Sequence, residues 1–505
     1  MVLLTERYAA KIRGVLSCFD RVIIQGNLSG VCHGQGMAAH ISSLGFRLFD
    51  YTKFAQPLRD IVRGNAERLA KENGLQIQFV RSSKERKENR VAAILKERGN
   101  HPGLVCILSA MEACPSFMPW FDKQKDKAIL RGKESKCLHY YFYFVDEEFG
   151  LCYLRVPTWA PFRLQFYFNG HHWLARKLDQ EGIAYTLIDN AFTDIADFEK
   201  AQAFADQFPV DHLHQALERL AAQFCPVATR FGIDYHWTLM QAEYATDIVF
   251  FRQKDLAPLY AALNRTAIYT VKPDRIATFL GRKLNGNYQD EMGNDFHTRI
   301  EGTCIKHHMG PVSIKLYDKF GLVLRIETAT NDVSFFKHYR EVAHKDGTRE
   351  TKFAAMLKTI YSLPPLRELM AAANRRYLEF LSALDDSSAG VRNVEKLSSP
   401  VRANNRTYRG FNLFSQADLE LLRALARGEF VSYGFTNRAL RRVLPGCNGA
   451  QVSRFLKRLR LHGLIKKVHA CYKYYLTKLG RTVLLTALKL KELVVFPALA
   501  QPAAA

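Results

Sequence analysis

The sequence predicts a multidomain protein of the α+β and α/β classes, in which mixed β-sheets carry helices and a small helical module ends the chain. Three observations support this prediction. With 505 residues the chain is too long for one hydrophobic core, so roughly two to four domains are expected. Strand and helix patterns alternate over residues 1–384. A polar stretch over 385–405, rich in Ser, Asp and Asn, is typical of a linker before a basic C-terminal segment.

Composition narrows the functional class. The hydrophobic fraction of 48% and the charged fraction of 24% are those of a soluble globular protein. The net charge of +23 favours a polyanionic partner, nucleic acid before a membrane surface. No apolar run approaches the roughly 20 residues of a membrane span, and the ten scattered cysteines indicate reduced thiols. We therefore expect a cytoplasmic protein without a membrane partner.

Residues 1–230 are predicted to form an α/β N-terminal body with a mixed sheet. Phe19–Gln25 is typical of a buried strand and Pro57–Asn73 of an amphipathic helix. Asp20, near the start of the first strand, is either a metal ligand or the partner of Arg21 in a local ion pair. Between residues 150 and 180 aromatic residues are interleaved with arginines; they either form core or stack on bases, so RNA is a second candidate partner. The aromatic residues are Trp159, Phe162, Phe166, Tyr167, Phe168 and Trp173, and the arginines are Arg155, Arg163 and Arg176.

Residues 231–384 are predicted to form a ferredoxin-like domain, because strands and helices alternate around a hairpin. Before the hairpin we expect helices over 254–265 and 273–283 with a strand over 267–271 between them, and after it helices over 333–342, 352–361 and 366–384. Glu243 and Asp247 lie four residues apart on a predicted strand, Ala242–Phe251. Alternate residues of a strand share a face, so both carboxylates should project to the same side.

The stretch Arg299–Asp332 is predicted to form three short strands joined by two tight turns. Alternation along the strands places Lys315, Tyr317, Arg325 and Glu327 on one side of the hairpin and apolar side chains on the other. Of the adjacent residues His307 and His308, only one can point to the polar side. Lys315 should then lower the pKa of Tyr317 and bind phosphate. We interpret Tyr317, Lys315 and Arg325 as candidate catalytic residues, and as candidate ligands of Mg²⁺ or Mn²⁺ the residues His307, Glu327, Glu243 and Asp247. The alternative is a half-exposed sheet with charged cross-strand pairs.

The segment SIKLYDKFGLVLRIE (Ser313–Glu327) resembles the one shared by the rolling-circle replication initiators of plasmids and filamentous phages. That resemblance implies an HUH-like fold, a Tyr317 nucleophile, and a divalent metal held by histidine and acidic residues, which together nick one DNA strand. The whole chain also resembles a bacterial family associated with mobile elements, which supplies no mechanism.

Residues 406–493 are predicted to form three helices and a β-hairpin. The helices cover Gln416–Ala426, Asn437–Leu444 and Ala450–His462, Ser415 caps the first, EFVSY forms a short strand, LIKKV and KYYLT form the hairpin, and Lys478–Leu493 closes the domain before a tail at 494–505. The run LRLHGLIKKV…YYLTKLGR resembles the winged helix-turn-helix domains of MarR-type regulators. The resemblance implies a recognition helix in the major groove of duplex DNA and a wing along the backbone.

The basic residues concentrate in this predicted domain. From Val401 onward the chain has 19 Lys and Arg against 4 Asp and Glu, a surplus of 15 out of the total +23. The candidate nucleic-acid contacts are Arg438, Arg441, Arg442, Arg454, Lys457, Arg458, Arg460, Lys466, Lys467 and Lys473.

The leading interpretation is a mobile-element type DNA-binding protein whose winged helix binds duplex DNA and whose body nicks or cleaves it by metal-assisted phosphodiester transfer. One alternative is a non-enzymatic winged-helix regulator whose body binds a ligand, RNA or a partner. The other is an RNase H-like nuclease that uses Asp20 with acidic residues such as Asp247 or Glu327.

Overall fold

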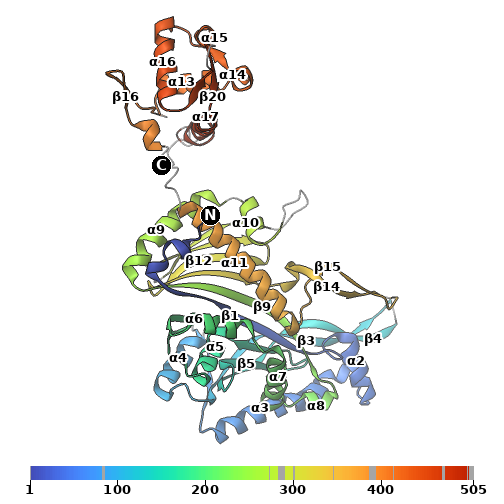
Figure 1. The fold of residues 1–505 in the computed structure, drawn as a ribbon. Helices are drawn as coiled ribbons and strands as arrows, with labels where there is room; N and C mark the ends of the chain where they lie inside the picture. Colours follow the sequence, from blue (N-terminus) through green and yellow to red (C-terminus); the bar gives the residue numbers. More distant parts are fainter. Residues whose placement is uncertain are drawn as a thin grey trace. The chain divides into compact units, whose positions relative to one another are not determined.

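The structure, a computed structural model, describes residues 2–81, 86–124, 126–271, 273–282, 291–299, 302–344, 346–385, 394–412, 414–468, 472–496 and 499. The chain divides into two compact units, Met1–Asp385 and Asp386–Ala505, here called the N-terminal and C-terminal units (Figure 1). Both combine helices and strands, so the mixed α/β class predicted from the sequence is confirmed. Within the described ranges no helix is long and apolar enough to cross a membrane.

One sheet of eleven strands organises the N-terminal unit. Its strands in spatial order are β10 (Met292–Arg299), β11 (Gly302–Met309), β12 (Val312–Lys319), β13 (Val323–Thr330), β9 (Tyr235–Phe250), β1 (Ile12–Leu28), β6 (Leu164–Phe168), β5 (Gly150–Pro157), β4 (Lys127–Asp146), β3 (Gly103–Asp122) and β2 (Ile77–Phe79). Among the described strands, only β2 and β3 pair in parallel. The strands expected in an N-terminal body and in a separate ferredoxin-like domain thus belong to one sheet, because β9 pairs with β1 along most of its length.

Apart from β2 at one edge, the sheet consists of two halves with the same strand order. Each half starts with a long strand, β1 or β9, and passes through helices. It then forms a four-stranded meander, β3–β6 or β10–β13, whose last strand pairs with the long strand of that half. The two long strands pair antiparallel at the centre. An approximate twofold relationship therefore lies between β1 and β9.

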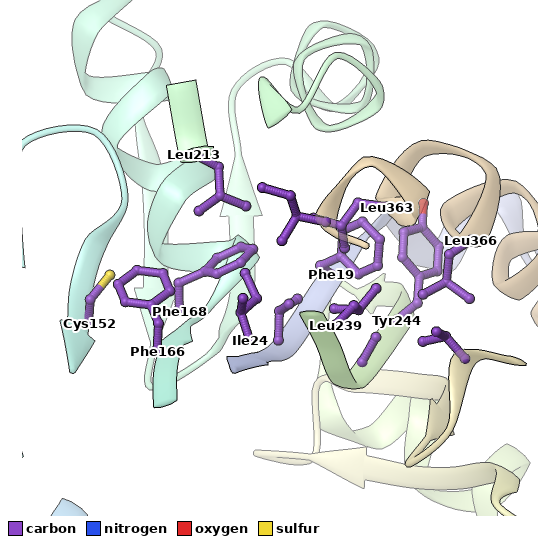
Figure 2. Close-up of a cluster of buried hydrophobic side chains, with 14 of the residues drawn as sticks. Phe19, Ile24, Cys152, Phe166, Phe168, Leu213, Leu239, Tyr244, Leu363 and Leu366 are labelled. Atoms are coloured by element: carbon purple, nitrogen blue, oxygen red, sulfur yellow. The ribbon is translucent and has the colours of Figure 1, made fainter. Parts of the chain in front are cut away.

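Helices cover one face of this sheet with an apolar core. α11 (Leu363–Asp385) packs on β9 and β13, while α3 (Tyr51–Glu72) and α7 (Val210–Phe224) pack over the other half. Figure 2 shows sheet side chains such as Phe166 and Tyr244 in the same buried layer as Leu213 of α7 and Leu366 of α11. Burial of these large apolar side chains supplies the main driving force for the fold.

The opposite face is covered differently in the two halves. α4 (Lys87–Arg98) packs there on β3, and Val91 joins a smaller core with residues of β3, β4 and β5. Near β1, β9 and β13 the face meets the start of α5 (Gly170–Gln180) and the turn between β7 (Tyr185–Ile188) and β8 (Ala191–Ile195). This part of the face holds polar side chains.

Three local predictions in the N-terminal unit are wrong. Residues 267–271, expected as a strand, mostly belong to α9 (Gln253–Thr270), because Leu263 and Ala267 are buried one helical turn apart. The helix expected over 333–342 is a 3-10 turn followed by β14 (Lys337–Ala343), and the helix expected over 352–361 overlaps β15 (Arg349–Ala355). These two strands pair as a separate hairpin, and exposure alternates along β14 with the period of a strand.

The C-terminal unit contains α13 (Gln416–Leu425), α14 (Gly428–Tyr433), β18 (Phe435–Thr436), α15 (Asn437–Val443), α16 (Gly449–Leu461), β19 (Ile465–Lys467), β20 (Lys473–Leu476) and α17 (Lys478–Leu490). The strands form a sheet of order β18-β20-β19. The predicted helices and hairpin are present, whereas EFVSY lies in α14 rather than in a strand. Thr436 caps α15 through its side chain, but Ser415 makes no such bond at α13.

The structure describes part of the expected linker over 385–405. Residues 394–398 are helical, and β16 (Val401–Ala403) pairs with β17 (Arg406–Tyr408). Residues 386–393 lie outside the described ranges, as do 497, 498 and 500–505 of the expected tail.

Candidate functional site

Three carboxylates from three neighbouring strands meet on the polar part of the sheet. Asp20 on β1, Glu243 on β9 and Glu327 on β13 each offer an oxygen, and these oxygens lie within 4.8 Å of one another. The register between β1 and β9 shifts between Phe19 and Arg21, opposite Glu243. A bulge re-aims the side chain at the irregular position, and here that side chain is Asp20.

Arg325 lies fully buried beside this group. Its Nε and Nη2 atoms donate to the two carboxylate oxygens of Asp247, each over 2.6 Å, and Nη1 lies 3.2 Å from Asp20. Burial alone would raise the pKa of Asp247, but the guanidinium lowers it. Both oxygens of Asp247 are thus engaged by Arg325. Asp247, predicted as a metal ligand, lies outside the group of three carboxylates and is the counter-ion of Arg325, although it does share a face with Glu243 as the alternation predicted.

Asp20 is positioned by Asn169, Asn190 and His171, none of which is among the predicted site residues. Asn169 caps α5 by accepting from the His171 amide, and its Nδ2 donates to Asp20 over 3.1 Å. Asn190, in the turn between β7 and β8, donates to the same oxygen over 2.5 Å, and His171 Nδ1 lies 3.3 Å from it. Asp20 pairs with Arg325 and not with its neighbour Arg21. The one sequence signal was a polar run, Asn-Gly-His-His, placed where β6 ends.

The hairpin of β12 and β13 has the polar side that alternation predicted. Lys315 lies opposite Glu327, and Tyr317 lies opposite Arg325. The Lys315 ammonium and the Tyr317 hydroxyl donate to the two oxygens of Glu327, and Lys315 also lies 3.5 Å from Glu243. Two hydrogen-bond donors therefore hold Glu327, and the Lys315 ammonium is close to both Glu327 and Glu243.

Burial and like charge set the proton affinities of this group. Burial raises the pKa of Glu243 to about 7, and the nearby charge of Glu327 adds to the effect. Burial and Glu327 also raise the pKa of Tyr317 well above its usual value. The expected lowering of the Tyr317 pKa by Lys315 is wrong, because the lysine charge is matched by Glu327 and Glu243.

His307 lies on the other face of the sheet. Its cross-strand partner is Ile314 of the apolar side, and its Nε2 lies 2.8 Å from the Tyr377 hydroxyl of α11. Burial lowers the His307 pKa to about 4. His307, predicted as a metal ligand, therefore lies outside the carboxylate group.

The carboxylates line a cavity of about 300 Å³. Its other lining residues include Lys315, Tyr317, Lys319 and the turn residue Asn190. Lys319 donates to Asn190 Oδ1, and burial together with the charge of Arg325 lowers the Lys319 pKa. The cavity thus combines carboxylate oxygens with two lysine amines, and the amine of Lys315 pairs directly with Glu327.

Oxygen ligands of this kind suit a hard divalent cation. Ligands of Mg²⁺ lie about 2.1 Å from the ion, so neighbouring ligands of the octahedron are about 3.0 Å apart and opposite ligands about 4.2 Å apart. The oxygens of Asp20, Glu243 and Glu327, within 4.8 Å of one another, can bind one ion after side-chain shifts of about 1 Å. The three carboxylates could therefore hold Mg²⁺ or Mn²⁺.

The candidate nucleic-acid contacts of the C-terminal unit divide into two groups. Nine are exposed or half-buried: Arg438, Arg441, Arg442, Arg454, Lys457, Arg460, Lys466, Lys467 and Lys473. Arg458 differs, because it is 5% exposed, donates to Asp418 over 2.6 and 2.9 Å, and lies over the Phe411 ring. Arg458 therefore joins α16 to α13 and does not face solvent, which corrects its assignment to DNA contact.

Comparison with known proteins adds no assignment: no family model, curated protein or solved structure matches the chain.

Proposed function

We propose that the chain is a metal-dependent enzyme that cleaves phosphodiester bonds in DNA. The observation that supports this most strongly is the convergence of Asp20, Glu243 and Glu327 in one cavity with two lysines. Carboxylates on adjacent strands offer the oxygen ligands that Mg²⁺ and Mn²⁺ need, and amines offer charge for a phosphate. Burial raises the pKa of Glu243 to about 7, and carboxylates with such shifted pKa values cluster at functional sites.

The residues of the cavity have separable roles in this proposal. A bound divalent ion would polarise the scissile phosphodiester and favour attack by water. Lys319, whose pKa is lowered, can give a proton to the leaving oxygen more readily than an ordinary lysine. Arg325 and the groups around Asp20 fix the carboxylates and act as positioning residues.

Tyr317 has two possible roles that differ in their products. As a positioning residue it holds Glu327 through its hydroxyl. As a nucleophile it would pass its proton to Glu327, attack the phosphorus, expel the 3′ oxygen and remain joined to the 5′ phosphate. We favour the first role because Tyr317 is 6% exposed and its pKa is raised.

The C-terminal unit supports the choice of DNA as substrate. Its helices and three-stranded sheet are in the order expected of a winged helix, with exposed arginines on α15 and α16 and lysines on β19. In that fold α16 would be the recognition helix and β19–β20 the wing. We propose that this unit recruits duplex DNA to the enzyme.

Cleavage of supercoiled and single-stranded DNA in Mg²⁺ or Mn²⁺ tests the proposal. The full chain should cleave, Asp20→Asn should abolish cleavage, and Asp60→Asn, at an exposed aspartate of α3, should not. Cleavage without a covalent protein adduct supports water as nucleophile; a 5′ adduct lost in Tyr317→Phe supports tyrosine. If neither form of DNA is cleaved with Mg²⁺ or with Mn²⁺, the proposed enzymatic function is overturned and a non-enzymatic DNA-binding protein is favoured.

A further inference from the structure

A larger cavity, of about 600 Å³, adjoins the carboxylates. It shares Asp20, Glu243, Asp189 and Asn190 with the smaller one, so the two cavities are adjacent. Three tyrosines line one side of it, and α4 lines the other with Val91, Ala92 and Leu95. Cavities of this size and apolar character are typical of ligand sites.

The three tyrosines form a row across the sheet. Tyr143 on β4, Tyr153 on β5 and Tyr167 on β6 are successive cross-strand partners. The rings of Tyr153 and Tyr167 stack with centres 5.0 Å apart and an angle of 9°, and the Tyr143 ring lies 5.2 Å from that of Tyr153. The row leads toward β1, where Tyr167 pairs with Ile23 beside Arg21. Of the aromatic segment after residue 150, Tyr167 thus faces this cavity, whereas Phe162, Phe166 and Phe168 are core.

Polar groups stand at both ends of the row. At the carboxylate end Arg21 is exposed, lines the cavity, and has its guanidinium 5.9 Å from the Tyr167 ring centre. At the other end Glu88, near Tyr143, offers a hydrogen-bond acceptor, and Asn100 also lines the cavity. A carboxylate can accept from the exocyclic amino group of a base, and an arginine can bind phosphate.

We infer that this cavity takes one unstacked base of a single-stranded nucleic acid, so that the phosphate next to that base reaches Asp20 and Glu243. The inference rests on the proposed function and specifies its substrate. Aromatic side chains stack on bases of any sequence with about 1–3 kcal/mol per base. A base in an intact duplex is stacked on its neighbours and cannot enter such a cavity. The substrate is therefore a single strand or a locally opened duplex.

Photochemical cross-linking of the full chain tests the inference without requiring cleavage. The probe is a single-stranded oligodeoxynucleotide with one 5-iodouracil, bound in Ca²⁺ and irradiated, with the cross-linked peptides identified by mass spectrometry. Cross-links should fall in α4 or in β4–β6. Ala92→Trp, at an exposed position that lines the cavity, should reduce them about fivefold or more, as expected for loss of about 1 kcal/mol.

The control is Ala93→Trp, at the next residue of α4, which is exposed but does not line the cavity and should leave cross-linking unchanged. Cross-links confined to other peptides, unaffected by Ala92→Trp, or equally strong with the modified base in a duplex would overturn the inference. Cross-links in the cavity of a chain that cleaves no DNA would support base binding and refute the nuclease. Cleavage with cross-links only elsewhere would refute the base site and leave the nuclease.

Discussion

Asp20 and Glu243 occupy matching positions in the two halves of the sheet, since each lies eight residues after the first residue of its long strand. The long strands pair at the approximate twofold, so the two carboxylates meet where the halves join. The third carboxylate, Glu327, comes from one half alone. The candidate site therefore exists only when both halves are folded against each other.

Removing the Arg325 guanidinium should destabilise the folded N-terminal unit. Arg325→Met leaves Asp247 and Asp20 buried without their main counter-ion, which costs about 3–5 kcal/mol for a buried pair broken on one side. Urea denaturation of the full chain measures the loss. Arg13→Ala, which breaks an exposed pair with Asp194, should cost about 1 kcal/mol or less. Equal, small losses in the two variants would contradict the role given to Arg325.

Stability should depend on the protonation of Glu243. Its folded pKa of about 7 lies above the ordinary 4.5, so the folded state binds the proton more tightly and loses stability as the pH rises from about 4.5 to 7. Glu243→Gln avoids this loss. Without metal, the variant should be more stable than the parent chain at pH 8 by up to about 3 kcal/mol, with the difference vanishing near pH 4. A difference that does not change with pH would show that Glu243 is ionised throughout.

Much of the hairpin chemistry was predictable from the sequence, because alternation along a strand is a local property. The shared side of Lys315, Tyr317, Arg325 and Glu327 follows from it. The pairing of β9 with β1 does not, since it joins residues more than 200 positions apart. Without that pairing Asp20 has no visible connection to Glu243.

The errors have similar causes. Which of two adjacent histidines faces the site depends on the register of β11, which turns His307 toward α11. Asn169, Asn190 and His171 act through a helix start and a turn that reach Asp20 only in the folded sheet. The sequence does not distinguish Arg458 from the other basic residues of α16, although Arg458 lies on the buried side of that helix.

Lys319 should act on the leaving group. Lys319→Met should slow cleavage of an ordinary phosphodiester by about 10²–10⁴-fold, the usual contribution of a general acid. It should have little effect on a substrate with a 3′-bridging sulfur, because a thiolate leaves without protonation. Lys315→Met is the comparison, since Lys315 pairs with Glu327 and should not show this rescue. Equal losses on both substrates would assign Lys319 a structural or binding role.

Substitutions of two arginines of α16 should have different effects, one on DNA binding and the other on stability. Arg454→Ala, at an exposed position, should lower the slope of log affinity against log salt by about one and leave the unfolding midpoint unchanged. Arg458→Ala should instead lower the midpoint, because Asp418 loses its partner. Measurements of duplex binding at several salt concentrations, with thermal unfolding of the same proteins, make the comparison. If Arg458→Ala lowered the salt slope and left the unfolding midpoint unchanged, Arg458 would contact DNA.

Metal binding by the carboxylates is the central claim, and titration of the full chain with Mn²⁺, followed by electron paramagnetic resonance, tests it most directly. We predict a saturable site that is lost in Asp20→Asn and weakened as the pH falls below about 7, where Glu243 takes up a proton. His307→Gln, on the opposite face, should leave the affinity unchanged. No saturable binding, or equal binding by Asp20→Asn and the parent chain, would contradict the metal site and the enzyme built on it.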